Sequence, residues 1–127
     1  MEVEIEVKKV DAKMIDQLIR KFYSVSVLAH TEHINTRSFA QHSALGSFYE
    51  KVNDMKDRVA EYLIGAGYLQ KVSVPILEMG SGILAEATAL AEMFCKCSED
   101  TDDDALENMA GEFEESVGKL KYLFKLS

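Results

Sequence analysis

Residues 30–67, HTEHINTRSFAQHSALGSFYEKVNDMKDRVAEYLIGAG, contain the features that decide the predicted fold of this chain. An apolar stripe with helical spacing ends shortly before Asn35, and a second stripe begins at Phe39 and continues to Ile64. The residues between them, Asn35-Thr36-Arg37-Ser38, favour a turn, and Thr36 or Ser38 can cap the helix that follows. The stretch therefore predicts the end of one amphipathic helix, a short turn and a complete second helix.

The same periodicity continues on both sides of this stretch. A first helix is predicted over 11–34 with Asp11 as its N-cap, a third over about 81–98 and a fourth over about 103–125. Residues 1–10 alternate acidic and apolar side chains, which predicts an extended N-terminal arm. The connection over 67–80 can stretch to roughly 45 Å, enough to cross a bundle from end to end. The expected fold is therefore all-α: a single domain over 1–127, a ferritin-like four-helix bundle with a long crossover between its second and third helices.

Composition places the chain among globular proteins and limits its partners. Of 127 residues, 47% are hydrophobic and 28% charged, and no apolar run approaches the roughly 18 residues of a membrane span. The N-terminus lacks the layout of a signal peptide, so a cytoplasmic location is expected. The formal net charge is −8, concentrated in the acidic run 99–115, and no basic tail is present. These features disfavour both a membrane and DNA as partners. Cys95 and Cys97 point to different sides of a helix, so we expect two reduced thiols.

All three histidines, His30, His33 and His42, lie within the first part of the quoted stretch. His30 and His42 stand on either side of Thr36 at equal separation, so an antiparallel hairpin is predicted to bring them level and facing one site. Imidazole nitrogens are common metal ligands. The alternative interpretation is a set of polar side chains satisfied at a turn.

Two carboxylates, Asp57 and Glu61, share one face of the second helix, beside its apolar stripe. Two imidazoles and two carboxylates form a ligand set that suits iron. His42 and Asp57 are separated by about 22 Å at the helical rise of 1.5 Å per residue, so they cannot bind one ion within one chain. Either the two pairs are unrelated, the carboxylates being a solvated pair, or a second chain related by a two-fold axis completes the site.

The run from His30 to Gly67 resembles the Dps family, small ferritin-like iron oxidases of bacteria that assemble as hollow dodecamers. In that family a histidine ends the first helix and a second follows twelve residues later in an F-x-x-H context. An aromatic pair lies six and seven residues beyond it, and an Asp and a Glu stand 15 and 19 residues after it. The same spacings occur here in His30, His42 of FAQH, Phe48-Tyr49, and Asp57 and Glu61 of DRVAEY.

This resemblance implies an iron-oxidising site between two subunits. His30 and His42 would come from one chain and Asp57 and Glu61 from its two-fold mate, and Fe²⁺ would be oxidised there by peroxide or oxygen and stored as ferric mineral. The implied assembly is a homo-oligomer built from two-fold dimers, in the family a dodecameric cage. The acidic run would line pores for entering cations, the alternative being a solvated loop; its candidate residues are Asp100, Asp102, Asp103, Asp104 and Glu107.

The chain also departs from the family pattern. The family commonly carries an Asp four residues after its second histidine, where this chain has Gly46, and a tryptophan after its first histidine, where this chain has Thr31. His33 has no counterpart in the pattern and is either an additional ligand or an exposed side chain. Three other functions therefore stay open: a ferritin-like shell without ferroxidase activity, a structural zinc-binding protein with His30, His33 and His42 as ligands, and, least supported by the charge, DNA binding.

Overall fold

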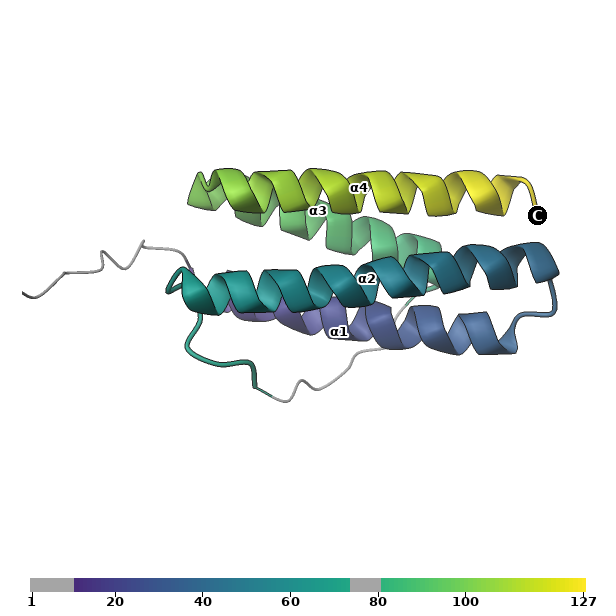
Figure 1. Cartoon of the computed structure of the whole chain (residues 1–127), viewed down its shortest axis with the longest axis horizontal. Helices are drawn as coiled ribbons and strands as arrows, with labels where there is room; N and C mark the ends of the chain where they lie inside the picture. The colour runs from purple at the N-terminus through teal and green to yellow at the C-terminus, as the bar shows by residue number, and fades with distance from the viewer. Residues whose placement is uncertain (1–10, 74–80) are drawn as a thin grey trace, which may run out of the picture.

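The computed structural model describes residues 11–73 and 81–127, and within these residues the chain forms four helices and no strand (Figure 1). This confirms the predicted all-α bundle of four helices. The predicted arm over 1–10 lies outside the described residues. The helices are α1 (Ala12–Asn35), α2 (Phe39–Gly65), α3 (Ile83–Thr101) and α4 (Asp104–Lys125).

The four helices form a bundle in which each packs against two others. α1 contacts α2 and α3, and α4 contacts α2 and α3, so α2 and α3 lie diagonally opposite each other. Tyr62, near the end of α2, bonds to Asp103, which lies in the turn between α3 and α4. Both helices therefore end at the same end of the bundle and run in the same direction (Figure 1). The predicted crossover between them includes residues 74–80, which lie outside the described residues.

Three of the four helices begin at a side-chain cap. The carboxylate of Asp11 accepts the backbone N–H of Lys13 at 3.0 Å, which confirms the predicted cap of α1. The hydroxyl of Ser38, rather than that of Thr36, accepts the N–H of Gln41 at 3.2 Å at the start of α2. Asp103 caps α4 in the same way, while α3 starts at Gly82 without a side-chain cap. Local sequence thus fixes most helix starts.

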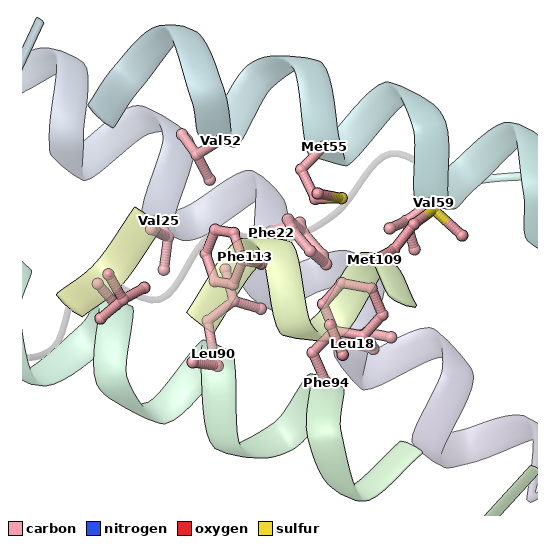
Figure 2. Packing of buried hydrophobic residues seen from close by; sticks show 14 of the residues in the cluster. Leu18, Phe22, Val25, Val52, Met55, Val59, Leu90, Phe94, Met109 and Phe113 are labelled. Carbon is pink, nitrogen blue, oxygen red and sulfur yellow. The ribbon is translucent and has the colours of Figure 1, made fainter. Parts of the chain in front are cut away.

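The core is built around one phenylalanine from each helix. The ring of Phe22 in α1 meets Phe94 of α3 at 5.5 Å and Phe113 of α4 at 5.4 Å between centroids (Figure 2). Phe48 of α2 completes the set at 6.1 Å from Phe113. All four side chains are buried. Edge-to-face and tilted contacts of this kind add to the free energy of burying the rings, so the four stripes read from the sequence converge at this point.

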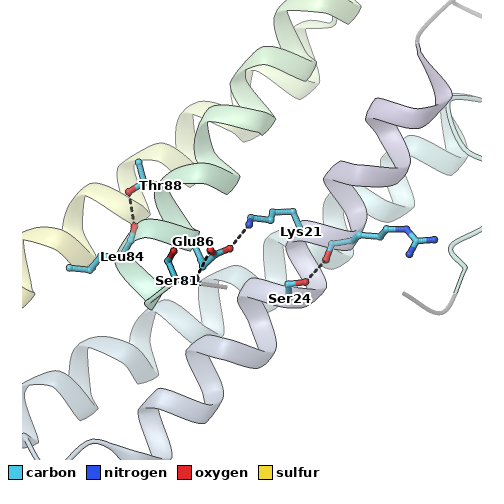
Figure 3. Close-up of polar contacts among 7 residues, drawn as sticks. Lys21, Ser24, Ser81, Leu84, Glu86 and Thr88 are labelled. Carbon is cyan, nitrogen blue, oxygen red and sulfur yellow. Dashed lines mark hydrogen bonds and ion pairs between the residues drawn. The ribbon is translucent and has the colours of Figure 1, made fainter. Parts of the chain in front are cut away.

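A polar contact fixes α3 against α1 outside the core. The ammonium group of Lys21 in α1 forms an ion pair with Glu86 in the first turn of α3, and Glu86 also accepts the N–H of Ser81 at 3.1 Å (Figure 3). The hydrogen bond from Lys21 lowers the pKa of Glu86, because it stabilises the charged form. Both side chains are largely shielded from solvent, so this pair orients α3 more firmly than an exposed pair would.

The turn between α3 and α4 is shorter than the predicted acidic loop, because α3 continues to Thr101 instead of ending near residue 98. The hydroxyl of Thr101 bonds to the carbonyl of Cys97 at 2.9 Å within this last turn. Asp102 then adopts a left-handed conformation, with φ of 50°, and its N–H bonds to the carbonyl of Glu99. Aspartate tolerates this conformation better than most residues. A tight cap therefore replaces most of the predicted loop.

Asp103 links this turn to α2. Its buried carboxylate accepts hydrogen bonds from the hydroxyl of Tyr62 at 2.6 Å and from that of Tyr68 at 2.9 Å, besides capping α4. Burial raises the pKa of Asp103, but the hydrogen bonds from the tyrosines and from backbone N–H groups outweigh it, so the pKa lies below its usual value. The same hydrogen bond to Asp103 raises the pKa of Tyr62 to about 12.

We predict that Tyr62→Phe lowers the free energy of unfolding by about 1.5 kcal/mol at neutral pH, because a hydrogen bond to a buried carboxylate is lost. The pKa of Asp103 is lowered by folding, so its contribution is present above its unfolded pKa and is lost as the pH falls through the folded value. The pKa of Tyr62 is raised, so its contribution is present below pH 10.0 and is lost as the pH approaches about 12.

Denaturant titrations of wild type and Tyr62→Phe between pH 3 and 11 test this. Tyr122→Phe, at an exposed tyrosine of α4, is the matched control and should leave stability unchanged. A stability difference between wild type and Tyr62→Phe that stays constant at both pH extremes would contradict the assignment.

Candidate metal centre

The three histidines lie along the seam between α1 and α2, close to the turn at 36–38. His30 and His33 stand one turn apart near the end of α1, and His42 lies in the first turns of α2. His30 and His42 are exposed, and His33 is half-buried. The seam therefore presents two imidazole groups where an ion from solution can reach them.

His33 and His42 form a reciprocal pair across this seam. Their rings stack with centroids 3.9 Å apart and planes at 19°. Nδ1 of His33 lies 2.7 Å from the carbonyl oxygen of His42, and Nδ1 of His42 lies 2.7 Å from the carbonyl oxygen of His33. A carbonyl oxygen only accepts, so each Nδ1 carries the proton and donates it. In the neutral rings each Nε2 then keeps a lone pair, and neither Nε2 bonds to a described residue.

Gly46 provides the space that the ring of His33 occupies. A Cβ atom at position 46 would lie 2.8 Å from Cε1 and 3.2 Å from Nδ1 of His33. Real Cβ atoms essentially never approach another atom as closely as the first of these distances. A side chain at position 46 would therefore require the ring of His33 to shift from this position.

His30 stacks on Tyr49 of α2, with centroids 4.6 Å apart, and does not stand level with His42 as predicted. The seam has the same register further along, where Ser26 bonds to Asn53. The prediction assumed that residues equally distant from the turn meet. Helical side chains lean toward the N-terminus of their helix, so those of α1 lean away from the turn and those of α2 lean toward it. This lean shifts the pairing in the direction observed.

The two predicted carboxylate ligands are exposed on the second half of α2. Neither Asp57 nor Glu61 forms an ion pair or hydrogen bond with a described residue, whereas the nearby Asp54 pairs with Arg58 at 3.9 Å. Helical rise places Asp57 about 22 Å from His42 along α2. Within 11–73 and 81–127, the chain brings together no group of three or more His, Cys, Asp or Glu side chains that could hold a metal ion. The predicted histidine and carboxylate ligands thus lie in two separate regions of the surface, and His30 and His42 have different stacking partners.

The five acidic residues predicted to line a pore differ in their surroundings. Asp100, Asp102, Asp104 and Glu107 are exposed at the end of α3 and the start of α4. Asp103 is buried, and its carboxylate is bonded to Tyr62, to Tyr68 and to the start of α4. The pore remains a prediction. The contacts of Asp103 give it a structural role, which is to hold the turn between α3 and α4 in place.

The two cysteines are free thiols, in agreement with the sequence-based expectation. Cys97 is buried in the core, and this burial raises its pKa to about 11. Burial also raises the pKa of Cys95, and a hydrogen bond to Glu114 acts in the same direction. Both thiols are protonated at neutral pH, so neither is a ready metal ligand or nucleophile.

Sequence reasoning missed three contributors to this region: the space at Gly46, the stack of Tyr49 on His30, and the tyrosines that hold Asp103. The glycine carried a usable signal. Glycine inside a helix costs roughly 1 kcal/mol relative to alanine, so its presence there often marks a close approach. Tyr62 and Tyr68 bond to Asp103, which is distant from both in the sequence, so no local sequence pattern predicts these contacts.

Fold and site together define an all-α protein whose described residues form a four-helix bundle with histidine and carboxylate side chains exposed on α1 and α2. The model of the family DUF5856, described as a family of unknown function, matches residues 33–124, and the chain belongs to this family. Comparison with curated proteins and with solved structures gives no significant match. Among the described helices, none combines the length and apolar character needed to cross a membrane.

We predict that Asp57→Asn and Glu61→Gln each change the free energy of unfolding of the chain by less than about 0.5 kcal/mol, because both carboxylates are exposed and form no ion pair or hydrogen bond with a described residue. Chemical denaturation at neutral pH measures this. Asp103→Asn is the contrasting control and should cost at least about 1 kcal/mol, because it weakens the bonds to two tyrosines. A large loss of stability in Asp57→Asn would show that this carboxylate has a structural role.

Proposed function

We propose that this protein is a ferritin-like, Dps-type oligomer that binds Fe²⁺ and oxidises it at sites formed between two chains. The observation that carries the proposal is the division of the ligand set into two half-sites, each exposed and incomplete. The histidines lie near the turn between α1 and α2, and Asp57 and Glu61 lie about 22 Å further along α2. A second chain, antiparallel to the first along α2, brings the two halves together.

In this arrangement each chain contributes to two equivalent sites. His30 and His42 of one chain bind the iron on one side, and Asp57 and Glu61 of the other chain bind it on the opposite side. A two-fold axis that crosses α2 repeats the arrangement, because two-fold interfaces use the same surface twice. His42 suits this role because its Nδ1 is held by the carbonyl of His33, which orients the ring and leaves Nε2 for the ion.

Iron is the substrate of the proposed reaction. Two Fe²⁺ ions lose one electron each, and one molecule of peroxide accepts both electrons together with two protons and gives two molecules of water. Oxygen is the alternative oxidant. The carboxylates of Asp57 and Glu61 are hard ligands that stabilise the Fe³⁺ product, which then moves on to a mineral.

The architecture supports the ferritin-like arrangement. Because α2 and α3 run in the same direction, a connection between them has to return along the bundle, as a long crossover does. The proposed assembly is a dodecameric cage like that of the Dps family. Carboxylates at its pores would attract cations, and four exposed ones are suited to this role: Asp100, Asp102, Asp104 and Glu107. A cytoplasmic location is part of the proposal.

A second candidate is a ferritin-like shell or structural protein that binds zinc without oxidising iron. Gly46 and His33 favour it, because the chain has a third imidazole and lacks a carboxylate at position 46. Zinc is redox-inactive and binds readily to imidazole nitrogen. Retention of zinc by the purified oligomer, without any acceleration of iron oxidation, would favour this candidate over the first.

We predict that the purified protein accelerates oxidation of Fe²⁺ by peroxide and that His42→Ala and Asp57→Ala each reduce the initial rate at least about tenfold, since each removes a ligand. The rate is followed by the absorbance of ferric iron. Glu50→Gln, at another exposed carboxylate of α2, is the matched control and should retain the wild-type rate. A wild-type rate no faster than that in buffer would refute the iron-oxidising function.

Subunit mixing tests the shared site directly. A dimer of one His42→Ala chain and one Asp57→Ala chain contains one site with both defects and one site with neither. Random reassembly of the two inactive variants should therefore restore about one quarter of the wild-type sites. Sedimentation showing only monomers, or no recovery on mixing, would contradict a site between chains.

A further inference from the structure

We infer that the outer face of α2 is a docking surface for a second copy of this chain, and that Phe39 and Ile64 set the register of the contact. Phe39 of each chain packs against Ile64 of the other, so the same apolar contact forms at both ends of a two-fold interface. The inference deepens the proposed function, on which it rests for the presence of a second chain, but it depends on residues that the iron chemistry does not use.

The first step of the argument is the exposure of two large apolar side chains on one helix face. Phe39, the first residue of α2, is 82% exposed, and Ile64, the last but one, is 43% exposed. At 100° per residue the two side chains point within about 20° of each other around the helix axis. Single exposed apolar side chains are common, but two on one face mark a surface that a partner can cover.

The second step is symmetry. A two-fold axis that crosses α2 between residues 51 and 52 lays the helix antiparallel against its copy and sets residue 39 opposite residue 64 twice. The same axis brings Glu61 of one chain level with His42 of the other, and Asp57 level with Gly46, since the members of each pair are equally distant from the axis. The register that buries the apolar ends therefore also carries the carboxylates to the histidines.

The third step is the polar centre of this face, where Glu50 and Asn53 lie on either side of the axis. The side-chain oxygen of Asn53 accepts hydrogen bonds from Ser26 at 2.5 Å and from Lys56 at 3.3 Å. Its NH₂ group donates to no described residue, and Glu50 is exposed. An amide N–H is a suitable donor to a carboxylate, so Glu50 of each chain has a partner in Asn53 of the other.

The fourth step is the change of charge along the helix. Residues 39–49 of α2 contain no acidic side chain, and the exposed Arg37 directly precedes the helix cap. The second half of α2 carries the exposed carboxylates of Asp57 and Glu61. An antiparallel copy sets the acidic half against the half without acids. Complementary charge of this kind favours one orientation and one register, so it selects a second copy as the occupant.

The test is site-directed cross-linking of the full-length protein. Phe39→Cys and Ile64→Cys are combined in a chain in which Cys95→Ser removes the half-buried native thiol, and a short bismaleimide joins neighbouring thiols. Positions 39 and 64 are about 37 Å apart along α2, so a link between them has to join two chains. We expect covalent dimers and nothing longer on a denaturing gel, because both links fall within one pair of chains.

Control variants exclude other contacts. Phe39→Cys alone and Ile64→Cys alone should give no covalent dimer, because the two-fold axis keeps equal residues about 37 Å apart. Phe39→Cys with Gly111→Cys, at an exposed position of α4, is the matched double variant and should also give none. Absence of dimers from the Phe39→Cys and Ile64→Cys chain, or covalent ladders that indicate head-to-tail contacts, overturns the inference.

Sedimentation of point variants measures the contribution of the apolar ends. Phe39→Asp should weaken self-association at least about tenfold, because a charged side chain opposite Ile64 is desolvated without a partner. Phe39→Leu stays apolar and should associate nearly as wild type does. Phe39 is exposed, so both variants should keep their helices, which circular dichroism verifies. Unchanged self-association in folded Phe39→Asp overturns the inference.

The outcomes separate this inference from the proposed function. Covalent dimers from the double cysteine variant, in a protein that does not oxidise iron, support the inference and refute the function. Iron oxidation without covalent dimers supports the function and overturns the inference.

Discussion

The register between α1 and α2 is the constraint on which the candidate site depends. The apolar stripes of the two helices fix this register when they bury Phe22 and Phe48 in the core. The same register places Ser26 against Asn53 and His30 against Tyr49 on the outer side of the seam. The polar and aromatic side chains along the seam are thus positioned by the apolar side chains in the core. A shift of one helical turn would preserve much of the hydrophobic contact and destroy the histidine pair.

Much of the fold followed from local physics. Helical periodicity and capping residues located all four helices to within a few residues, because each stripe must be buried and each start needs a partner for its free N–H groups. The end of α3 was predicted too early, since a run of acidic residues was interpreted as a loop. Asp102 and Thr101 instead close the last turn, and this depends on backbone geometry that composition does not express.

The candidate site was only partly accessible from the sequence. Spacing and the family resemblance predicted His30, His42, Asp57 and Glu61 as ligands, and helical rise alone separates His42 from Asp57 too far for one ion to bind both within one chain. Which histidine stacks on which could not be read from spacing, because the lean of side chains along two antiparallel helices decides it. No sequence pattern predicted a contact for His33. Its packing against Gly46 became apparent only in the structure.

The close fit of His33 over Gly46 also constrains how this protein can change in evolution. Both positions lie inside the segment shared with the DUF5856 family, 33–124. Replacement of the glycine alone would collide with the imidazole, and loss of the imidazole alone would leave an unneeded flexible residue inside α2. The residues allowed at positions 33 and 46 therefore depend on each other. Correlated substitution at this pair would record the gain or loss of the histidine stack across the family.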